Sequence, residues 1–196
     1  MKYICSGLLL LSVFTTFAGD KEPFIEKGTH TVGIAYGFPN VIGEKDPRVS
    51  IGSVIVTADR QLSKRFNIGL QYNFNYTDGG PRTRMLTNNI SYQSVAKSFS
   101  HRVSFNSEYC FVNRGKVCLG SGLGMAIGVQ RTYVNYNYTQ NIVLRDNNYT
   151  VFELAFMLRL VDVQVKLKDN LSVTGCLGYG YDGLVTAGVQ YTFRRK

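Results

Sequence analysis

The residues best suited to catalysis are the two histidines, His30 and His101. A serine nucleophile needs a histidine base within hydrogen-bonding reach, and a carboxylate usually orients that histidine. His101 has serines nearby, at Ser98, Ser100 and Ser104, but no His-x-Ser motif follows it, and His30 lies between two threonines. We therefore expect both histidines to be structural, and His101 is the base that an enzymatic alternative would have to use.

Charged residues form a second group of candidates. Glu108, Glu153 and Arg159 all occur in segments where apolar and polar residues alternate. We expect them on one interior face, where a buried carboxylate requires a partner. The pattern therefore predicts an interior network of ion pairs and hydrogen bonds rather than a catalytic pair of carboxylates.

Cysteines form the third group. Cys110, Cys118 and Cys176 follow no spacing typical of a metal site, so we expect no metal and no other cofactor. If Asn113-Arg114-Gly115 is a three-residue hairpin loop with Gly115 in the left-handed conformation, Cys110 directly faces Cys118. An oxidising compartment permits a disulfide between them, but directly opposed strand cysteines strain it. Both a disulfide and two reduced neighbours therefore stay open, and Cys176 is expected to be a small interior residue.

The elements that must position these residues are β-strands. From Phe66 to Tyr76, every even position is apolar or aromatic and every odd position is Asn, Gln or Gly, which is the period of a strand with two unlike faces. Similar patterns recur along the chain. They predict eight strands, at 28–38, 49–62, 66–76, 100–112, 117–129, 149–167, 171–180 and 184–193.

Three details of these strands can be tested. Val54-Ile55-Val56 is apolar on both faces, so the register of the second strand stays open. In the sixth, the apolar positions are even up to Leu160 and odd from Val161, which predicts a β-bulge there. The fifth strand has a glycine-rich face, which suits a crowded interior where larger polar residues of neighbouring strands need room.

The start of the chain resembles an export signal. Lys2 is followed by a largely apolar run from Ile4 to Phe17, and Thr16-Phe17-Ala18 fits a cleavage site. We expect a signal peptide at 1–18 and one β-barrel domain at 19–196. No later segment contains an apolar run long enough for a transmembrane helix. The formal net charge of +9 comes from scattered basic residues, so no nucleic-acid partner is expected.

The connectors alternate between short and long. Those at 63–65, 113–116 and 168–170 are tight, whereas 39–48, 77–99 and 130–148 are long and polar. Short periplasmic turns and long outer loops are typical of transmembrane β-barrels, whose exterior is apolar and whose interior is polar. We therefore predict an all-β fold, an eight-stranded antiparallel up-and-down transmembrane β-barrel. A soluble ligand-binding barrel, with the apolar face turned inward, is an alternative.

Two motifs carry a family resemblance. The last strand ends Val189-Gln190-Tyr191-Thr192-Phe193, with Arg194-Arg195-Lys196 after the aromatic residue, and Gly120-Ser121-Gly122-Leu123-Gly124 follows a tight turn. With the length and layout of the chain, they resemble the small eight-stranded bacterial outer-membrane proteins of the OmpA/OmpX-like group. The resemblance implies a location in the bacterial outer membrane and contact with its lipid, but the group includes adhesins, structural proteins, assembly factors and a few lipid enzymes. Because no His-x-Ser motif is present, we expect a non-enzymatic structural or surface-interaction role. A lipid-modifying outer-membrane enzyme is the enzymatic alternative.

Two surfaces could bind partners. We expect the loops at 77–99 and 130–148 to contact an extracellular protein or glycan through arginines and tyrosines, a mixture typical of interaction surfaces. These candidates are Arg82, Arg84, Arg131, Tyr133, Tyr136, Tyr138 and Arg145. The tight turns are basic and could contact lipid headgroups or an acidic periplasmic partner. Their basic residues are Lys64, Arg65, Arg114, Lys116, Lys166 and Lys168, and the tail adds Arg194, Arg195 and Lys196.

Overall fold

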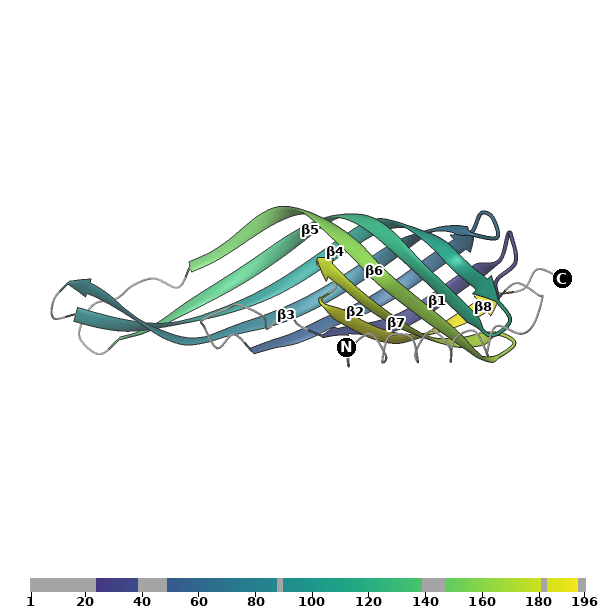
Figure 1. The fold of residues 1–196 in the computed structure, drawn as a ribbon. Coiled ribbons are helices and arrows are strands. Elements are labelled where there is room, and N and C mark those ends of the chain that lie inside the picture. The colour runs from purple at the N-terminus through teal and green to yellow at the C-terminus, as the bar shows by residue number, and fades with distance from the viewer. Residues whose placement is uncertain (1–23, 39–48, 88–89, 139–146, 181–182, 194–196) are drawn as a thin grey trace, which may run out of the picture.

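The computed structural model describes residues 24–38, 49–87, 90–138, 147–180 and 183–193, and side chains are not described at 49–51, 81–92 and 137–138. The predicted signal peptide lies outside these residues, as does the tail from Arg194. Figure 1 shows eight strands wound into one elongated barrel. They are β1 (His30–Phe38), β2 (Val49–Gln61), β3 (Phe66–Thr87), β4 (Ile90–Arg114), β5 (Val117–Tyr138), β6 (Asn147–Lys168), β7 (Leu171–Gly180) and β8 (Val185–Phe193).

Every strand pairs antiparallel with its neighbour in the chain, and the first also pairs with the last, which closes the barrel. Ile34 illustrates the closure, because it lies opposite Val56 of β2 on one side and Val189 of β8 on the other. The predicted fold class, an eight-stranded antiparallel up-and-down barrel, is confirmed. Within the described residues we find no helix with the length and apolarity needed to cross a membrane.

The barrel is apolar outside and polar inside. Leu70 is 58% exposed, whereas the next residue, Gln71, is 1% exposed. Buried polar side chains line the interior, among them Ser53, Asn67, Asn73, Ser104, Asn106, Glu108, Asp162 and Gln164. Exposed apolar side chains form an outer belt that includes Val103, Phe105, Leu123, Met125, Ile127, Leu154, Phe156 and Leu158. A soluble barrel would have the reverse arrangement, so the fold is that of a transmembrane barrel and the soluble alternative is wrong.

Two of the open details are now settled. Ile55 points inward and is 2% exposed, while Val54 and Val56 belong to the outer belt, which fixes the register of β2. The predicted bulge in β6 is confirmed, because the pairing of β6 with β7 shifts between Arg159 and Val161. Leu160 and Val161 are both exposed as a result. One extra residue on the outer face therefore turns the polar positions of β6 inward again.

The strands differ in length more than the sequence pattern predicts. β3, β4 and β5 extend about ten residues beyond the predicted strand ends, so most of 77–99 and the first part of 130–148 are strand rather than loop. Asn, Ser, Thr and Tyr break the apolar alternation there, but the backbone continues to pair. Figure 1 shows these strands running far past the others at one end. We call this the long-strand end, and the opposite end, with turns at 62–65, 115–116 and 169–170, the tight-turn end.

Candidate functional site

Glycines of β5 leave space across which interior side chains of β4 and β6 meet. Gly128 lies between Arg102 and Glu153 in one row of paired residues. Arg102 donates to Glu153 Oε2 from Nε at 2.9 Å and from Nη2 at 2.6 Å. A Cβ at Gly128 would lie 2.5 Å from Arg102 Cγ and 2.6 Å from the His101 carbonyl oxygen. The ion pair therefore depends on the absence of a side chain at Gly128, which lies on the strand between the two partners.

A second row places Gly122 between Glu108 and Arg159. Arg159 also contacts residues outside this row. Its Nη2 donates to Gln71 Oε1 at 2.8 Å, and Asn106 Nδ2 donates to the same oxygen at 2.8 Å. Arg159 Nη1 also lies 3.8 Å from Asp162 Oδ2. The three predicted lumen residues thus point inward but do not form one network, because Glu153 pairs with Arg102 and Arg159 contacts Gln71 and Asp162.

Glu108 belongs to a third arrangement, near the tight-turn end. Asn67 Nδ2 donates to Glu108 Oε2 at 3.2 Å, and Cys110 Sγ lies 3.8 Å from Glu108 Oε1. One carboxylate oxygen of Glu108 and the two sulfur atoms of Cys110 and Cys118 all lie within 4.8 Å of one another, and all three side chains are buried. We call these three residues the thiol–carboxylate cluster. Its ligand types suit a soft metal ion better than any other group of described residues.

The predicted pairing of the two cysteines is wrong. The turn has two residues, Gly115 and Lys116. A register shift between Cys110 and Val112 then changes the β5 partner of Cys110 by one residue. Cys110 therefore pairs with Gly120 and Cys118 with Asn113. The cysteines are diagonal neighbours rather than directly opposed, although both still point inward. None of the three described cysteines forms a disulfide, and Cys176 is half-buried.

The segment before β1 covers the interior at the tight-turn end. Phe24 and Ile25 pack against Cys110 and Cys118. Asn113 fixes this segment, because its Oδ1 accepts from Ile25 N and its Nδ2 donates to Ile25 O, both at 3.2 Å. The segment therefore shields the thiol–carboxylate cluster from the solvent at this end.

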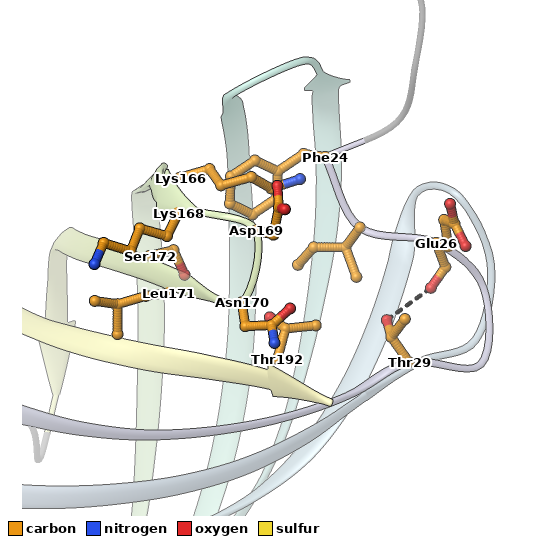
Figure 2. A pocket seen from close by; sticks show the side chains of 11 residues that line it. Phe24, Glu26, Thr29, Lys166, Lys168, Asp169, Asn170, Leu171, Ser172 and Thr192 are labelled. Carbon is orange, nitrogen blue, oxygen red and sulfur yellow. Dashed lines mark hydrogen bonds between the residues drawn. The ribbon is translucent and has the colours of Figure 1, made fainter. Parts of the chain in front are cut away.

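Figure 2 shows the rim around that segment. Lys166 lies over the Phe24 ring, with Nζ 5.1 Å from its centroid, and Lys168 and Asp169 line the same shallow pocket. Thr29 Oγ1 donates to Glu26 O at 2.7 Å and holds the turn into β1. Of the other basic residues predicted for the tight turns, Lys64, Arg65, Arg114 and Lys116 are exposed at this end.

His101 has no serine partner. It is exposed on the outer face, where Tyr72 Oη and His101 Nδ1 lie 2.6 Å apart. Ser100 and Ser104 are buried on the inner face, and Ser98 hydrogen-bonds Thr132 at 3.0 Å. Residues at odd and even positions of one strand point to opposite faces. The strand geometry thus separates the candidate base from each of its candidate nucleophiles.

His101 instead belongs to an aromatic patch on the outer face of β3, β4 and β5. Ring centroids lie 5.1 Å apart for Phe74 and His101, 4.9 Å for Tyr76 and Phe99, and 5.9 Å for Phe99 and Tyr133. Aromatic girdles mark the boundary between hydrocarbon and water in membrane barrels. From Tyr76 to Thr87, β3 runs a further length of about 35 Å along the strand at roughly 3.3 Å per residue.

Beyond the aromatic patch, β3, β4 and β5 form a projecting sheet, defined as residues 77–87, 90–98 and 130–138, and the start of β6 pairs with β5 as far as Val134. Arg82 and Arg84 lie in β3 and Tyr138 lies in β5, but their side chains are not described. Arg145 lies outside the described residues. Arg131 is exposed, and Tyr133 and Tyr136 are half-buried. The candidate contacts that can be placed thus belong to paired strands.

Several interior residues were missed by the sequence analysis. Arg102 is two residues before Ser104 on the polar face of β4, so extending that alternation would have found it. Asp162 follows the bulge that the sequence predicts, and the face change implies that it points inward. No local signal identifies Gln71 as the shared acceptor, because that contact joins β3 to β6 across the interior.

No protein-family model matches the sequence, and no curated protein does. Solved structures do match. The N-terminal β-barrel domain of Pseudomonas aeruginosa OprF is 9% identical with a TM-score of 0.52, covering 86% of this chain and 100% of that one. The Yersinia pestis attachment invasion locus protein Ail is 15% identical with a TM-score of 0.40, covering 85% and 99%. Neisserial surface protein A is 14% identical with a TM-score of 0.35, covering 84% and 95%.

At these identities the comparisons concern the fold. The OprF domain is matched over its whole length, and its match extends over most of this chain. Together with the closed eight-stranded ring and the polar interior, this result agrees with the resemblance seen in the sequence. The chain therefore has the fold of the small outer-membrane β-barrel proteins.

Proposed function

We propose that the protein is a non-enzymatic, integral protein of the bacterial outer membrane with a structural or surface-interaction role. The outer apolar belt supports contact with membrane lipid. The tight-turn end would face the periplasm and the long-strand end the exterior, as in barrels with short inner turns. A signal peptide at 1–18 would deliver the chain. The separation of His101 from its candidate serines supports the absence of catalysis.

The observation that carries this proposal is the projecting sheet. Its strands continue to pair beyond the aromatic patch, where no other described strand accompanies them for their full length. Such a sheet presents main-chain groups and side chains to the exterior at a fixed geometry. Sites on strands position their side chains better than sites on loops.

The charge of the projecting sheet indicates the kind of partner. The projecting sheet contains the basic residues Arg82, Arg84, Lys97 and Arg131 and one acidic residue, Asp78, near its base. A surface with an excess of one sign of charge attracts partners of the opposite sign. We therefore expect an extracellular protein or glycan that carries negative charge.

The test compares two sets of charge removals on the purified barrel in detergent. One variant carries R82Q, R84Q, K97Q and R131Q in the projecting sheet. The matched control carries K64Q, R65Q, R114Q and K116Q at the tight-turn end, with the same change in net charge. With heparin as a polyanionic probe, we expect the first variant to lose at least tenfold in affinity and the control to keep that of the parent. Equal losses would show that only net charge matters and would contradict the proposal.

The basic tight-turn end supports a second, smaller proposal, contact with an acidic periplasmic partner or with anionic lipid headgroups. Lys64, Arg65, Arg114 and Lys116 are exposed there. Each basic residue near an anionic membrane surface contributes about 1 kcal/mol of attraction. Crosslinking in cells, with the tight-turn variant above as the comparison, tests the protein partner. An unchanged set of crosslinked proteins would leave only the lipid contact.

A further inference from the structure

The thiol–carboxylate cluster combines donors from two strands at one point inside the barrel. Glu108 and Cys110 come from β4 and Cys118 from β5, and their donor atoms lie within 4.8 Å of one another. Cys110 and Cys118 are each 1% exposed and Glu108 is 4% exposed. Two thiols and a carboxylate are common ligands of zinc-class ions. The sequence does not reveal this group, because the spacing from 110 to 118 is set by a turn and a bulge.

The space for this cluster is provided by a glycine. Gly120 lies between Cys110 and Asp162 in one row of the sheet, and a Cβ there would lie 2.6 Å from Glu108 Oε1. Asn67 holds the other carboxylate oxygen of Glu108 at 3.2 Å. The carboxylate is therefore oriented with Oε1 toward Cys110. Hydrogen bonds of this kind, which fix a ligand without touching the metal, are typical of metal sites.

The surroundings hold more acidic than basic side chains. Asp162 is 5% exposed, and its Oδ1 accepts no hydrogen bond from the described residues. Asp59 and Glu108 lie near Asp162, and Arg159 is the cation near all three. Three carboxyl groups thus share one guanidinium at this depth. Buried carboxyl groups without enough counter-charge hold protons or a bound cation, and they do not attract an anion.

We propose that Glu108, Cys110 and Cys118 bind one thiophilic divalent metal ion of the zinc class. Ligands of one tetrahedral zinc lie roughly 3.3–3.8 Å apart, given Zn–S bonds of about 2.3 Å and Zn–O bonds of about 2.1 Å. The donors therefore need to approach by about 1 Å or less, which side-chain rotation can provide. Binding requires thiolates, so the thiol protons are released to solvent as the metal–sulfur bonds form. A disulfide is the competing state, and the diagonal placement of the cysteines disfavours it.

The position of the cluster suits a metal site shielded from bulk solvent, in which a water molecule would take the fourth position beside the three protein ligands. Phe24 and Ile25 cover the two cysteines from the tight-turn end, and Asn113 holds Ile25 by two hydrogen bonds of 3.2 Å. A metal here would join β4 to β5 beneath the N-terminal segment. The ion would therefore stabilise the barrel and would not be exposed to a substrate.

The test uses Co²⁺ alone as the probe, added to the barrel purified in detergent after reduction with a non-chelating phosphine. We expect one Co²⁺ per barrel, with the absorption of thiolate-to-cobalt charge transfer and of tetrahedral cobalt, and displacement by one equivalent of Zn²⁺. Cys110→Ser and Cys118→Ser should each remove most of the charge-transfer signal. Asn67→Ala should keep the signal but weaken affinity about 10- to 100-fold, as for other residues that orient ligands.

Cys176→Ser is the matched control, because Cys176 is a described cysteine outside the cluster. It should keep the full cobalt spectrum. The heat-dependent gel mobility of each variant shows that its barrel has folded before the metal is added. The absence of a thiolate signal in the reduced, folded parent would overturn the proposal, as would an equal loss in Cys176→Ser. A Cys110–Cys118 disulfide in the isolated protein, with no cobalt binding after reduction, would assign the pair to disulfide formation instead.

Discussion

Strands β3, β4 and β5 contribute both to the closed barrel and to the projecting sheet, but their side chains have different surroundings in the two regions. Inside, polar side chains such as Gln71 and Asn106 are buried and bond across the barrel. In the projecting sheet, neighbouring residues such as Lys97, Arg131 and Asn135 are exposed. Pairing between strands is common to both regions, whereas closure is confined to one. We therefore expect interior packing to determine stability, and the projecting sheet to tolerate change without loss of the barrel.

The largest effect is expected where a side chain is added between interior partners. Gly128→Val would place atoms 2.5 Å from Arg102 Cγ and 2.6 Å from the His101 carbonyl oxygen. Overpacking costs about 1–3 kcal/mol, and a broken buried ion pair adds about 3 kcal/mol or more. We expect little or no heat-shifted, folded form on gels. Gly175→Val is the control, since a Cβ there would lie 3.9 Å from its nearest neighbour, the Thr186 carbonyl oxygen. Equal behaviour of the two variants would contradict the packing argument.

The next effect comes from removing one member of the interior ion pair. Arg102→Met leaves the Glu153 carboxylate without its two donors at 2.6 and 2.9 Å. We expect a loss of about 3 kcal/mol in the free energy of unfolding, measured by urea titration in lipid vesicles. The double variant R102M/E153M should recover most of the loss, because no buried charge stays unpaired. A double variant as unstable as the single one would show that the loss of stability does not come from the unpaired Glu153 carboxylate.

An effect of similar size is expected to distinguish the outer apolar belt from the projecting sheet. Leu154→Arg puts a charge on the apolar outer face and should cost about 2–4 kcal/mol if the site lies near the bilayer midplane. Asn135→Arg puts the same charge on an exposed position of the projecting sheet and should cost close to nothing. Urea titration in vesicles measures both. Similar costs at the two positions would mean that the boundary at the aromatic patch is misplaced.

The smallest effect concerns His101. Its removal by His101→Ala breaks the 2.6 Å contact with Tyr72, and one such hydrogen bond contributes about 0.5–1.5 kcal/mol. We expect a small loss of stability and no change in the acylation of membrane lipid, followed by mass spectrometry of extracted lipid. A changed acylation pattern would revive the enzymatic alternative and end the interpretation of His101 as part of a girdle.

Most of the fold could be predicted because strand faces are encoded by local alternation. The bulge at Leu160 and Val161 is an example, since a change of parity in the sequence appears as a shift of register in the barrel. The long strands were missed for a related reason. In the projecting sheet Asn, Ser, Thr and Tyr occur on both faces, so the alternation on which the prediction depends disappears while the pairing continues.

The interior contacts were harder to predict. The partner of Glu153 is Arg102, two strands away in space, and nothing in the sequence near either residue indicates the other. The cysteine register failed because a two-residue turn and a bulge replaced the expected three-residue loop. Contacts of this kind depend on the summed register of several strands, so a single local error changes the partner.

The most direct test replaces residues 79–96 with a two-residue Asn-Gly turn between the paired residues Asp78 and Lys97, which removes most of the β3–β4 part of the projecting sheet without a change of register. The shortened protein is then compared with the parent for membrane location, heat-dependent gel mobility and binding to heparin. The account predicts that the shortened barrel stays in the membrane and keeps its heat-dependent shift, while binding falls at least tenfold. A barrel that no longer folds, or one that binds heparin as well as the parent does, would contradict the division into a closed scaffold and a separate contact surface.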